Sequence, residues 1–396
     1  MNMNEQMKES EESILHTYNR FPVVFEKGQG CYLYDSEGKE YLDFAAGIAV
    51  NSLGYHYPGY DEALKDQIDK LMHISNLYYN EPIIEAGAKL VKASKMSKAF
   101  FTNSGTEAIE GALKAAKKYA YVRDGHADHE IIAMNHSFHG RSIGALSVTG
   151  TAHYREPFEP LMGGVKFADF NDLESVKAQI TDKTCAIITE VVQGEGGIYP
   201  AKKEFLEGLR QICDEKDIML IFDEIQCGMG RTGHYFAWQA YGVQPDIMTS
   251  AKALGCGVPV GAFVLSEKAA KASLEPGDHG TTYGGNPFVC AAVSKVFDIY
   301  KNDKIIEHVQ EMTPYLEQKL DEIVAKHECA VTRRGMGFMQ GIVIQGRSVG
   351  EVVKAALAKG LLVISAGSDV LRIVPPLVIT KEHIDKMAAI LDECME

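Results

Sequence analysis

The middle of the chain alternates short apolar runs with amphipathic segments, and this alternation restricts the fold more than any other feature. Runs typical of buried strands lie at 98–103, 130–136, 165–170, 185–192, 218–225 and 246–251. Helical patterns separate them, most clearly at 172–180 and 202–217. Strands that are apolar on both faces and separated by helices indicate a parallel sheet covered on both sides. The sequence therefore predicts an α/β fold with a mainly parallel sheet.

The pattern changes near residue 290, which predicts a second, smaller α+β domain. Residues 286–302 are typical of a long helix leaving the sheet, and 334–345 and 370–380 are typical of strands. The stretch GCYLYDSEGKEYLDF near the start is typical of a hairpin. We predict three parts: an N-terminal segment packing with the small domain (1–55), a large domain (56–290) and a C-terminal small domain (291–396).

Charge and hydropathy argue against nucleic acids and membranes as partners. The 396 residues include 40 Lys and Arg but 54 Asp and Glu, a net charge of −14. Such a chain repels phosphate backbones and anionic lipids. No run approaches the ~18 apolar residues of a membrane span. The polar, acidic start also lacks the features of a signal peptide, which favours the cytoplasm.

The cysteines and histidines predict no metal site. Eight cysteines are scattered along the chain without a C-x-x-C pair, which is typical of buried thiols. The closest histidine pairs are His126/His129 and His136/His139. No cysteine or carboxylate completes a recognisable zinc pattern around either pair.

Polar residues that follow the predicted strands are the candidate site residues, because ligands of α/β sheets bind beyond the carboxyl ends of the strands. Ser104 and Glu107 have the S-x-x-E spacing of a capping box. The helix start at Gly105 would offer free N–H groups to a phosphate. Taken alone, this motif is more typical of an ordinary capped helix.

Two further strand ends carry charged residues. Asp223 ends an apolar run, where a carboxylate needs a cationic partner such as a protonated pyridine nitrogen, a magnesium ion or an internal arginine. Strand alternation would place Ile225 on the same side, against a flat ring, and Gln226 could bond a phenolic oxygen. Lys252 ends another run; desolvated there, its free amine would suit a Schiff base, although most lysines reach solvent. The three ends together match the needs of pyridoxal 5′-phosphate (PLP).

A glycine motif offers a hypothesis from another class of enzyme. Gly228, Gly230 and Gly233 form a G-x-G-x-x-G after a strand, followed by Asp246, which is typical of a nicotinamide-dependent dehydrogenase. The acidic pair Asp223-Glu224 lies where a pyrophosphate would approach, and HYFAWQAYG is a poor start for a crossover helix. Both features disfavour this hypothesis. A non-catalytic scaffold with the same fold is a third.

With these motifs in order, the chain resembles the class III, fold-type I PLP-dependent aminotransferases from Tyr18 to its C-terminus, and within them the branch acting on N-acetylornithine. The resemblance rests on YNRFPVVFEKGQGCYLYD, DFAAGIAVNSLG, NSGTEA, NHSFHGR, QGEGG, IFDEIQCGMGRTG, TSAKALGCGVP, GDHGTTYGGNP and LRIVPPL. It implies a large and a small domain, PLP as the cofactor and a homodimer with shared active sites.

The resemblance also implies roles for individual residues. Lys252 would form the Schiff base and shuttle a proton, and Asp223 would keep the ring nitrogen protonated. The other cofactor contacts would be Gly105 and Thr106 at the phosphate, Phe138 and Ile225 on the two ring faces, Gln226 at the phenolic oxygen, and Thr282 at the phosphate of the partner's cofactor.

For the substrates, the resemblance implies two arginine clamps. Arg141 would bind the α-carboxylate of the amino donor and Arg372 that of glutamate or 2-oxoglutarate, with Thr281 at the substrate edge. Glu195 would pair with Arg372 when no second carboxylate is present. The family usually has Glu-Pro before this loop, whereas Val191 follows the glutamate here, a change expected to relax the loop.

The function that the resemblance implies is transfer of the δ-amino group of N2-acetyl-L-ornithine to 2-oxoglutarate, a step of arginine biosynthesis. Ornithine, 4-aminobutyrate and succinyl-diaminopimelate aminotransferases share the same lysine, aspartate and arginine clamp. They remain the alternatives within the family.

Overall fold

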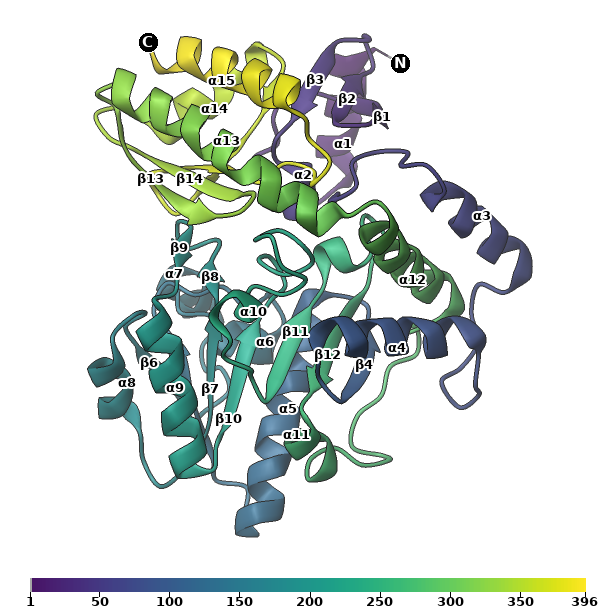
Figure 1. Cartoon of the computed structure of the whole chain (residues 1–396), viewed down its shortest axis with the longest axis vertical. Coiled ribbons are helices and arrows are strands. Elements are labelled where there is room, and N and C mark those ends of the chain that lie inside the picture. The colour runs from purple at the N-terminus through teal and green to yellow at the C-terminus, as the bar shows by residue number, and fades with distance from the viewer. Residues whose placement is uncertain (1) are drawn as a thin grey trace.

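The computed structural model describes residues 2–396 and is built around one central sheet (Figure 1). Its seven strands have the order β4-β12-β11-β10-β7-β5-β6. They are β4 (Lys98–Thr102), β5 (Glu130–Met134), β6 (Val165–Ala168), β7 (Thr184–Glu190), β10 (Met219–Asp223), β11 (Ile247–Ser250) and β12 (Gly261–Leu265). The predicted α/β fold with a mainly parallel sheet is confirmed. The sequence analysis missed β12, which runs antiparallel to both of its neighbours.

Two apolar layers cover the sheet, because successive side chains of a strand point to opposite faces. Ile187 and Leu220 pack with Leu206 of α9 (Lys203–Lys216) on one face. Ile188 and Ile221 belong to the other face, with α5 (Gly105–Asp124). The chain is apolar on both faces of these strands for this reason.

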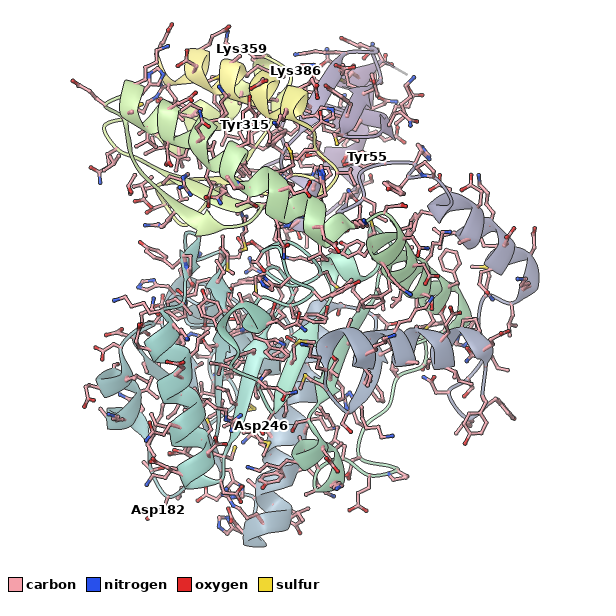
Figure 2. The ribbon with its side chains drawn as sticks, viewed as in Figure 1. Tyr55, Asp182, Asp246, Tyr315, Lys359 and Lys386 are labelled. Carbon is pink, nitrogen blue, oxygen red and sulfur yellow. The ribbon has the colours of Figure 1, made fainter. Side chains whose placement is uncertain are left out.

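Two smaller sheets lie above the central one in Figure 1, beside both chain ends. The first contains β1 (Phe25–Gln29), β2 (Tyr32–Asp35), β3 (Glu40–Asp43) and β15 (Leu361–Leu362). The predicted hairpin is present as β2 and β3, and β3 pairs in parallel with β15. Lys386, labelled in Figure 2, lies near this sheet and forms an ion pair with Glu40 at 3.0 Å. The division of the chain at residues 55 and 290 stays a prediction.

The second small sheet corrects two predicted strands. It contains β13 (Ala330–Met336), β14 (Met339–Ile344), β17 (Val370–Ile373) and β16 (Ile364–Ala366). The run 334–345 is not one strand, because the chain reverses at Gly337, whose φ of 59° suits glycine. The run 370–380 ends as a strand at Ile373, since Pro375 and Pro376 have no N–H for a ladder.

Helices fill the space between and around the sheets. The remaining helices are α1 (Met3–Ser13), α2 (Ala46–Ala49), α3 (Tyr60–Lys70), α4 (Glu81–Ser94), α6 (Ile143–Ser147), α7 (Ala152–Arg155), α8 (Leu173–Gln179), α10 (Trp238–Tyr241), α11 (Glu267–Lys271), α12 (Pro287–Asn302), α13 (Ile305–Lys326), α14 (Val349–Ala358) and α15 (Lys381–Met395). β8 (Val192–Gln193) and β9 (Tyr199–Pro200) pair as an antiparallel two-stranded ribbon. Within residues 2–396, no helix has the length and apolarity needed to span a bilayer.

We predict that Gly111→Ala destabilises the protein by about 2 kcal/mol, because α5 packs directly on β12 at this point. An added Cβ would lie 2.2 Å from the ring of Phe263. Gly87→Ala in α4 is the matched control: its Cβ would lie 3.9 Å from Phe101, so better helix propensity should leave stability unchanged or raise it by about 0.5–1 kcal/mol. Urea unfolding of both variants measures the difference. Equal effects would contradict the close packing.

Candidate active site

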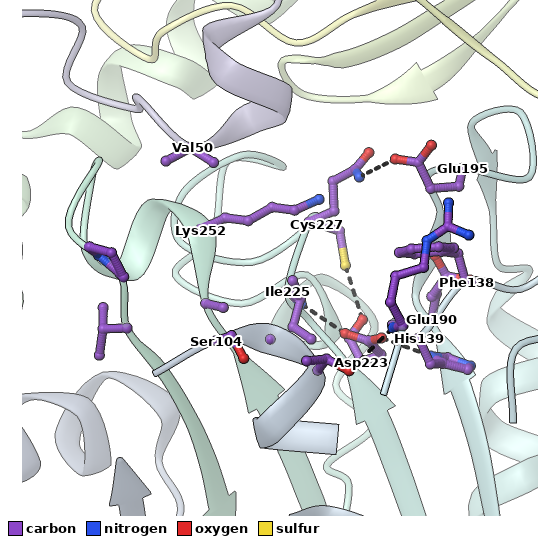
Figure 3. A pocket seen from close by; sticks show the side chains of 18 of the residues that line it. Val50, Ser104, Phe138, His139, Glu190, Glu195, Asp223, Ile225, Cys227 and Lys252 are labelled. Atoms are coloured by element: carbon purple, nitrogen blue, oxygen red, sulfur yellow. Dashed lines mark hydrogen bonds and ion pairs between the residues drawn. The ribbon is translucent and has the colours of Figure 1, made fainter. Parts of the chain in front are cut away.

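A cavity of about 390 Å³ opens at the carboxyl ends of the central strands. This is the edge at which ligands of α/β sheets bind. The structure brings nine of the predicted site residues into its lining: Gly105, Thr106, Phe138, Arg141, Glu195, Asp223, Ile225, Gln226 and Lys252. Lys252 and Asp223 line this one cavity, Asp223 at the end of β10 and Lys252 in the turn after β11 (Figure 3).

Lys252 is delivered to the cavity by an unusual turn after β11. Its φ is +49°, a left-handed conformation uncommon for residues other than glycine, and it begins a single 3₁₀ turn ending at Leu254. Burial lowers the pKa of the Lys252 ammonium to about 8, although the carboxylate of Glu195 acts in the opposite direction. A buried amine with this pKa is partly unprotonated near neutral pH and can act as a nucleophile.

Asp223 is the last residue of β10 and accepts three hydrogen bonds. Its Oδ2 lies 2.7 Å from His139 Nδ1, and its Oδ1 accepts the Thr249 hydroxyl at 3.1 Å and the Ile225 N–H at 3.0 Å. The strand has therefore ended before Ile225, so a turn, and not strand alternation, carries Ile225 to the cavity. Sequence reasoning missed His139 as a partner because the contact joins residues far apart in the chain.

Glu190 is a second buried carboxyl group beside Asp223, and sequence reasoning also missed it. It ends β7 in register with Asp223 on β10, and its Oε2 and Oε1 accept the N–H groups of Phe138 at 3.3 Å and Gly194 at 3.2 Å. Burial, followed by the charge of Asp223, raises the pKa of Glu190 well above its usual value. A carboxyl group inside the apolar run 185–192 was the available signal.

The start of α5 forms the predicted cradle for an anion, with one correction. The Ser104 hydroxyl accepts the Glu107 N–H at 3.3 Å, but the Glu107 carboxylate accepts the N–H of Asn103 and not that of Ser104. Half of the predicted capping box is therefore present. At Gly105, a Cβ would lie 2.9 Å from Ile225 Cδ1, so a side chain there would fill the cradle.

Glu195, which lines the cavity, forms an ion pair with Arg372, which lies outside the lining. Arg372 Nη1 and Nη2 lie 2.5 and 3.2 Å from the two Glu195 oxygens, and Arg372 is 3% exposed. Burial acts to raise the pKa of Glu195, but the Arg372 guanidinium outweighs it, and the net pKa is lowered. The Gln226 amide bonds both side chains, at 3.1 Å each, so here it is committed to this pair.

The loop that carries Glu195 is held from both sides. The Glu195 carbonyl accepts the Gly367 N–H and the Val191 carbonyl accepts the Ala201 N–H, both at 2.9 Å. Arg334 of β13 donates to the Gly197 carbonyl at 2.7 Å. Val191 in place of the family's usual proline therefore leaves a loop fixed by backbone hydrogen bonds.

Arg141 lies at the exposed rim of the cavity with its guanidinium free. Its Cζ lies 4.1 Å from the ring centre of Tyr154 and 5.3 Å from that of Phe138. Within the described residues, its side chain makes no hydrogen bond or ion pair. All five N–H donors of the guanidinium are therefore available to a ligand.

Thr281 and Thr282 lie outside the cavity lining. The Thr281 hydroxyl accepts the side-chain N–H of Asn103, a lining residue, at 3.3 Å. The side chain of Thr282 is exposed to solvent. Within one chain, Thr282 is thus separate from the residues that the resemblance places around the phosphate.

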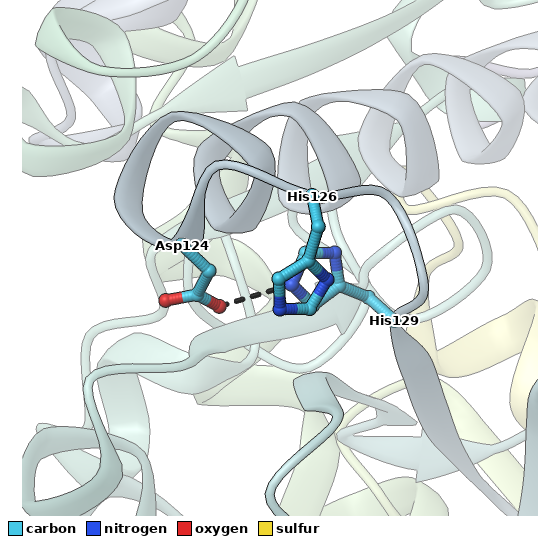
Figure 4. A group of neighbouring side chains, drawn as sticks. All are labelled: Asp124, His126 and His129. Atoms are coloured by element: carbon cyan, nitrogen blue, oxygen red, sulfur yellow. Dashed lines mark hydrogen bonds and ion pairs between the residues drawn. The ribbon is translucent and has the colours of Figure 1, made fainter.

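A second cluster lies at the end of α5, where Asp124 stands beside His126 and His129 (Figure 4). A carboxylate therefore lies beside this histidine pair, although no recognisable zinc pattern in the sequence indicated it. The two rings are stacked, with centres 4.7 Å apart and an angle of 15° between them, so their in-plane lone pairs do not converge. Both Asp124 oxygens also accept N–H groups of Arg123 at 2.6 Å. That no metal binds stays a prediction.

The glycine motif does not form a dinucleotide site. The helix after Gly233 is α10, which has four residues, and a Cβ at Gly228 would lie 2.6 Å from the Glu224 carbonyl. The buried Glu224 accepts the N–H groups of Ala237 and Trp238 at 2.8 Å each. A carboxylate therefore occupies the backbone donors that a pyrophosphate would need.

Comparisons with known proteins agree with this geometry. The family described as aminotransferase class-III matches residues 14–395. Acetylornithine aminotransferase of Clostridium acetobutylicum is 47% identical over 98% of this chain and 100% of its own length. Succinylornithine transaminase of Yersinia pseudotuberculosis is 44% identical over 94% and 92%. A crystal structure of ornithine aminotransferase from Toxoplasma gondii has a TM-score of 0.95 and 28% identity, covering 100% of this chain and 95% of that one.

The chain belongs to the class-III aminotransferases. It is a PLP-dependent transaminase, and the cavity fits this cofactor: Lys252 supplies a buried amine, Asp223 a buried acceptor, and Gly105 an open cradle at a helix start. When bound, PLP supplies an electron-withdrawing ring that stabilises negative charge next to the transferred nitrogen. The dehydrogenase and scaffold hypotheses are thereby set aside.

We predict that the cofactor-free protein takes up PLP faster as the pH rises through about 8, and that the rate levels off above this range. The fraction of Lys252 present as free amine follows its lowered pKa. An ordinary lysine would keep gaining free amine beyond pH 10. Stopped-flow absorbance measures the rate, and borohydride fixation with peptide mapping locates the label. Lys252→Ala should carry none, and a rate still rising at pH 10 would contradict the prediction.

Proposed function

We propose that the chain transfers the δ-amino group of N2-acetyl-L-ornithine to 2-oxoglutarate, giving N-acetylglutamate 5-semialdehyde and L-glutamate. The observation that carries this proposal is that two arginines near the buried Lys252 differ in whether a carboxylate of the protein neutralises their charge. Arg141 is free at the rim, whereas Arg372 is neutralised by Glu195. Such a site suits two substrates that differ in their number of carboxylates.

The free guanidinium of Arg141 suits the α-carboxylate of the amino donor. A planar guanidinium binds a carboxylate through two parallel hydrogen bonds. With that end held at the rim, the far amine of an extended donor points inward to Lys252. In this arrangement Lys252 would move the proton of the substrate carbon. Asp223, which is bonded to His139, would stabilise the protonated ring nitrogen of PLP.

The Arg372–Glu195 pair suits the second substrate. A donor with one carboxylate leaves the pair closed, and the α-carboxylate of glutamate or 2-oxoglutarate competes with Glu195 for the guanidinium. Since Arg372 is buried, its charge needs a carboxylate partner, and exchanging one carboxylate for another conserves the charge balance there. Thr281, through Asn103, would line the substrate edge.

The choice of acyl group on the donor is supported by the relatives. Those named as acetylornithine aminotransferases are 44–48% identical, and the succinylornithine transaminase, at 44%, lies at the lower end of this range. The ornithine aminotransferase structure is 28% identical. An N-acetyl group also removes the charge of the α-amine, which suits a rim where Arg141 already carries a positive charge.

We predict the highest kcat/KM for N-acetylornithine when donors are compared at fixed 2-oxoglutarate. N-succinylornithine, ornithine, 4-aminobutyrate and succinyl-diaminopimelate are the competing donors. Ornithine should be poorer because its α-ammonium faces Arg141, and 4-aminobutyrate because its shorter chain cannot span the cavity from the rim. A coupled assay of glutamate formation measures all five. A higher kcat/KM for any competitor would overturn the assignment of the donor.

We also propose that the active unit is a homodimer in which Thr282 contacts the phosphate in the partner's site. Exposed apolar side chains lie next to this threonine in the chain and in the nearby segment 77–79: Tyr283 is 63% exposed, Leu77 is 87% exposed, and Tyr79 is 95% exposed. The Asn76 side chain donates to the Gly284 carbonyl at 2.9 Å, and this bond joins the segment of Leu77 and Tyr79 to that of Thr282. Soluble monomers rarely expose such a surface, and a second copy would cover it.

We predict that Tyr79→Asp shifts the protein toward monomers and weakens PLP binding, because it adds a charge to the proposed interface. Tyr121→Asp is the matched control, since Tyr121 is exposed on α5 away from this surface. Sedimentation velocity measures the oligomer and absorbance titration the affinity for PLP. A dimer that is unaffected by Tyr79→Asp would contradict the proposed interface.

We propose the cytoplasm as the site of action. Within the described residues all eight cysteines are free thiols, and seven of them are buried. This pattern is typical of a reducing compartment.

A further inference from the structure

The side chain of Arg141 lies against aromatic rings. Its Cζ lies 4.1 Å from the ring centre of Tyr154, within the range of a cation–π contact, and 5.3 Å from that of Phe138. The two rings meet edge to face, with centres 5.8 Å apart and an angle of 78°. The guanidinium therefore lies at an aromatic corner.

Tyr154 belongs to α7, a separate element from the loop that carries Arg141 and Phe138. Its ring is half-buried and is supported by the ring of His153, with centres 3.9 Å apart. The Tyr154 hydroxyl makes no hydrogen bond within residues 2–396. The ring face, and not the hydroxyl, is thus the part of Tyr154 that contacts Arg141.

We propose that Tyr154 is the positioning residue of Arg141 and thereby sets the affinity of the site for the carboxylate of the amino donor. The physical reason is that an aromatic face orients a guanidinium without occupying its donors. A carboxylate partner would hold Arg141 equally well but would use its N–H groups and neutralise its charge. Tyr154 does neither, so the Arg141 guanidinium stays charged and oriented, with its N–H donors available to a ligand.

This arrangement contrasts with Arg372, the other arginine of the site. Arg372 is fixed by Glu195, so a ligand carboxylate must replace an ion pair. Arg141 needs no such exchange. The two arginines therefore differ in selectivity: Arg141 accepts any carboxylate at the correct reach, whereas Arg372 binds only a ligand that outcompetes Glu195. Tyr154 determines how readily Arg141 accepts a ligand carboxylate.

The proposal rests on the proposed role of Arg141, and a ligand that cannot react tests it without relying on turnover. N-acetyl-L-norvaline has the carboxylate and acetyl group of the donor but no δ-amine. Isothermal titration calorimetry of the PLP-bound protein with this ligand gives Kd directly. The amide of N-acetylnorvaline lacks the carboxylate and is the control ligand.

Tyr154→Leu should raise the Kd of N-acetylnorvaline about 5-fold, in the range expected for a lost cation–π contact. Tyr154→Phe keeps the ring and should stay within about 2-fold of the wild type. The weak binding of the amide should not change. In steady state with N-acetylornithine, Tyr154→Leu should raise KM while kcat is nearly unchanged, because the reacting end of the donor is not affected.

Two further variants separate positioning from a general effect on the fold. Phe167→Leu removes the ring that lies 4.3 Å from Arg155, the neighbour of Tyr154 in α7, and should leave Kd unchanged. Arg141→Ala should raise Kd by at least as much as Tyr154→Leu. Adding Tyr154→Leu to Arg141→Ala should then have no further effect, because Tyr154 acts through Arg141.

The outcomes distinguish the two proposals. If Arg141→Ala leaves the Kd of N-acetylnorvaline unchanged, the donor clamp of the proposed function fails, and this inference fails with it. If Arg141→Ala raises Kd but Tyr154→Leu does not, only the role of Tyr154 is overturned. An equal rise in Phe167→Leu, or an additive effect in the double variant, would show a structural effect of α7 and also overturn it.

Discussion

Two carboxyl groups at the ends of neighbouring strands set the electrostatics of the whole site. Asp223 and Glu190 are paired in register on β10 and β7, and both are at least 95% buried. Two like charges so close in a dry environment are strongly disfavoured. Among residues 2–396, the two groups have different hydrogen-bond partners: the His139 ring and the Thr249 hydroxyl face Asp223, whereas Glu190 accepts only two backbone N–H groups. Asp223 is thus the group equipped to carry the negative charge.

Glu190 also connects parts of the site that are far apart in the sequence. Through its two oxygens it contacts the backbone of Phe138, in the loop of Arg141, and that of Gly194, in the loop of Glu195. The loops of Arg141 and Glu195, which we propose act on the two different substrates, are therefore fixed to one buried group on the central sheet. The shape of the cavity and its charge both depend on Glu190, so neither can change alone.

The sequence predicted the parts of the site that lie at strand ends. Lys252 and Asp223 follow apolar runs, and a charge in such a place is visible without a structure. The partners of Asp223 were not visible, because His139 reaches it across the sheet and Glu190 lies beside it only through strand register. The same limit explains β12, which continues no βα alternation, and the hairpin at 334–345, where Gly337 interrupts an otherwise uniform apolar run. Ile225 was placed in the cavity for the wrong reason, since the turn at Asp223 depends on a local side-chain contact.

The pairing of β3 with β15 joins residues 42 and 43 to residues 361 and 362. A ribosome adds about 5–20 residues per second, so the N-terminal sheet waits roughly 15–60 s for its last strand. During that time the edge of β3 is an open strand, a known starting point for aggregation. The strand is short, and its first residue, Glu40, is charged and exposed, which are features that protect such edges. The nascent protein thus carries its own protection against premature association until synthesis is almost complete.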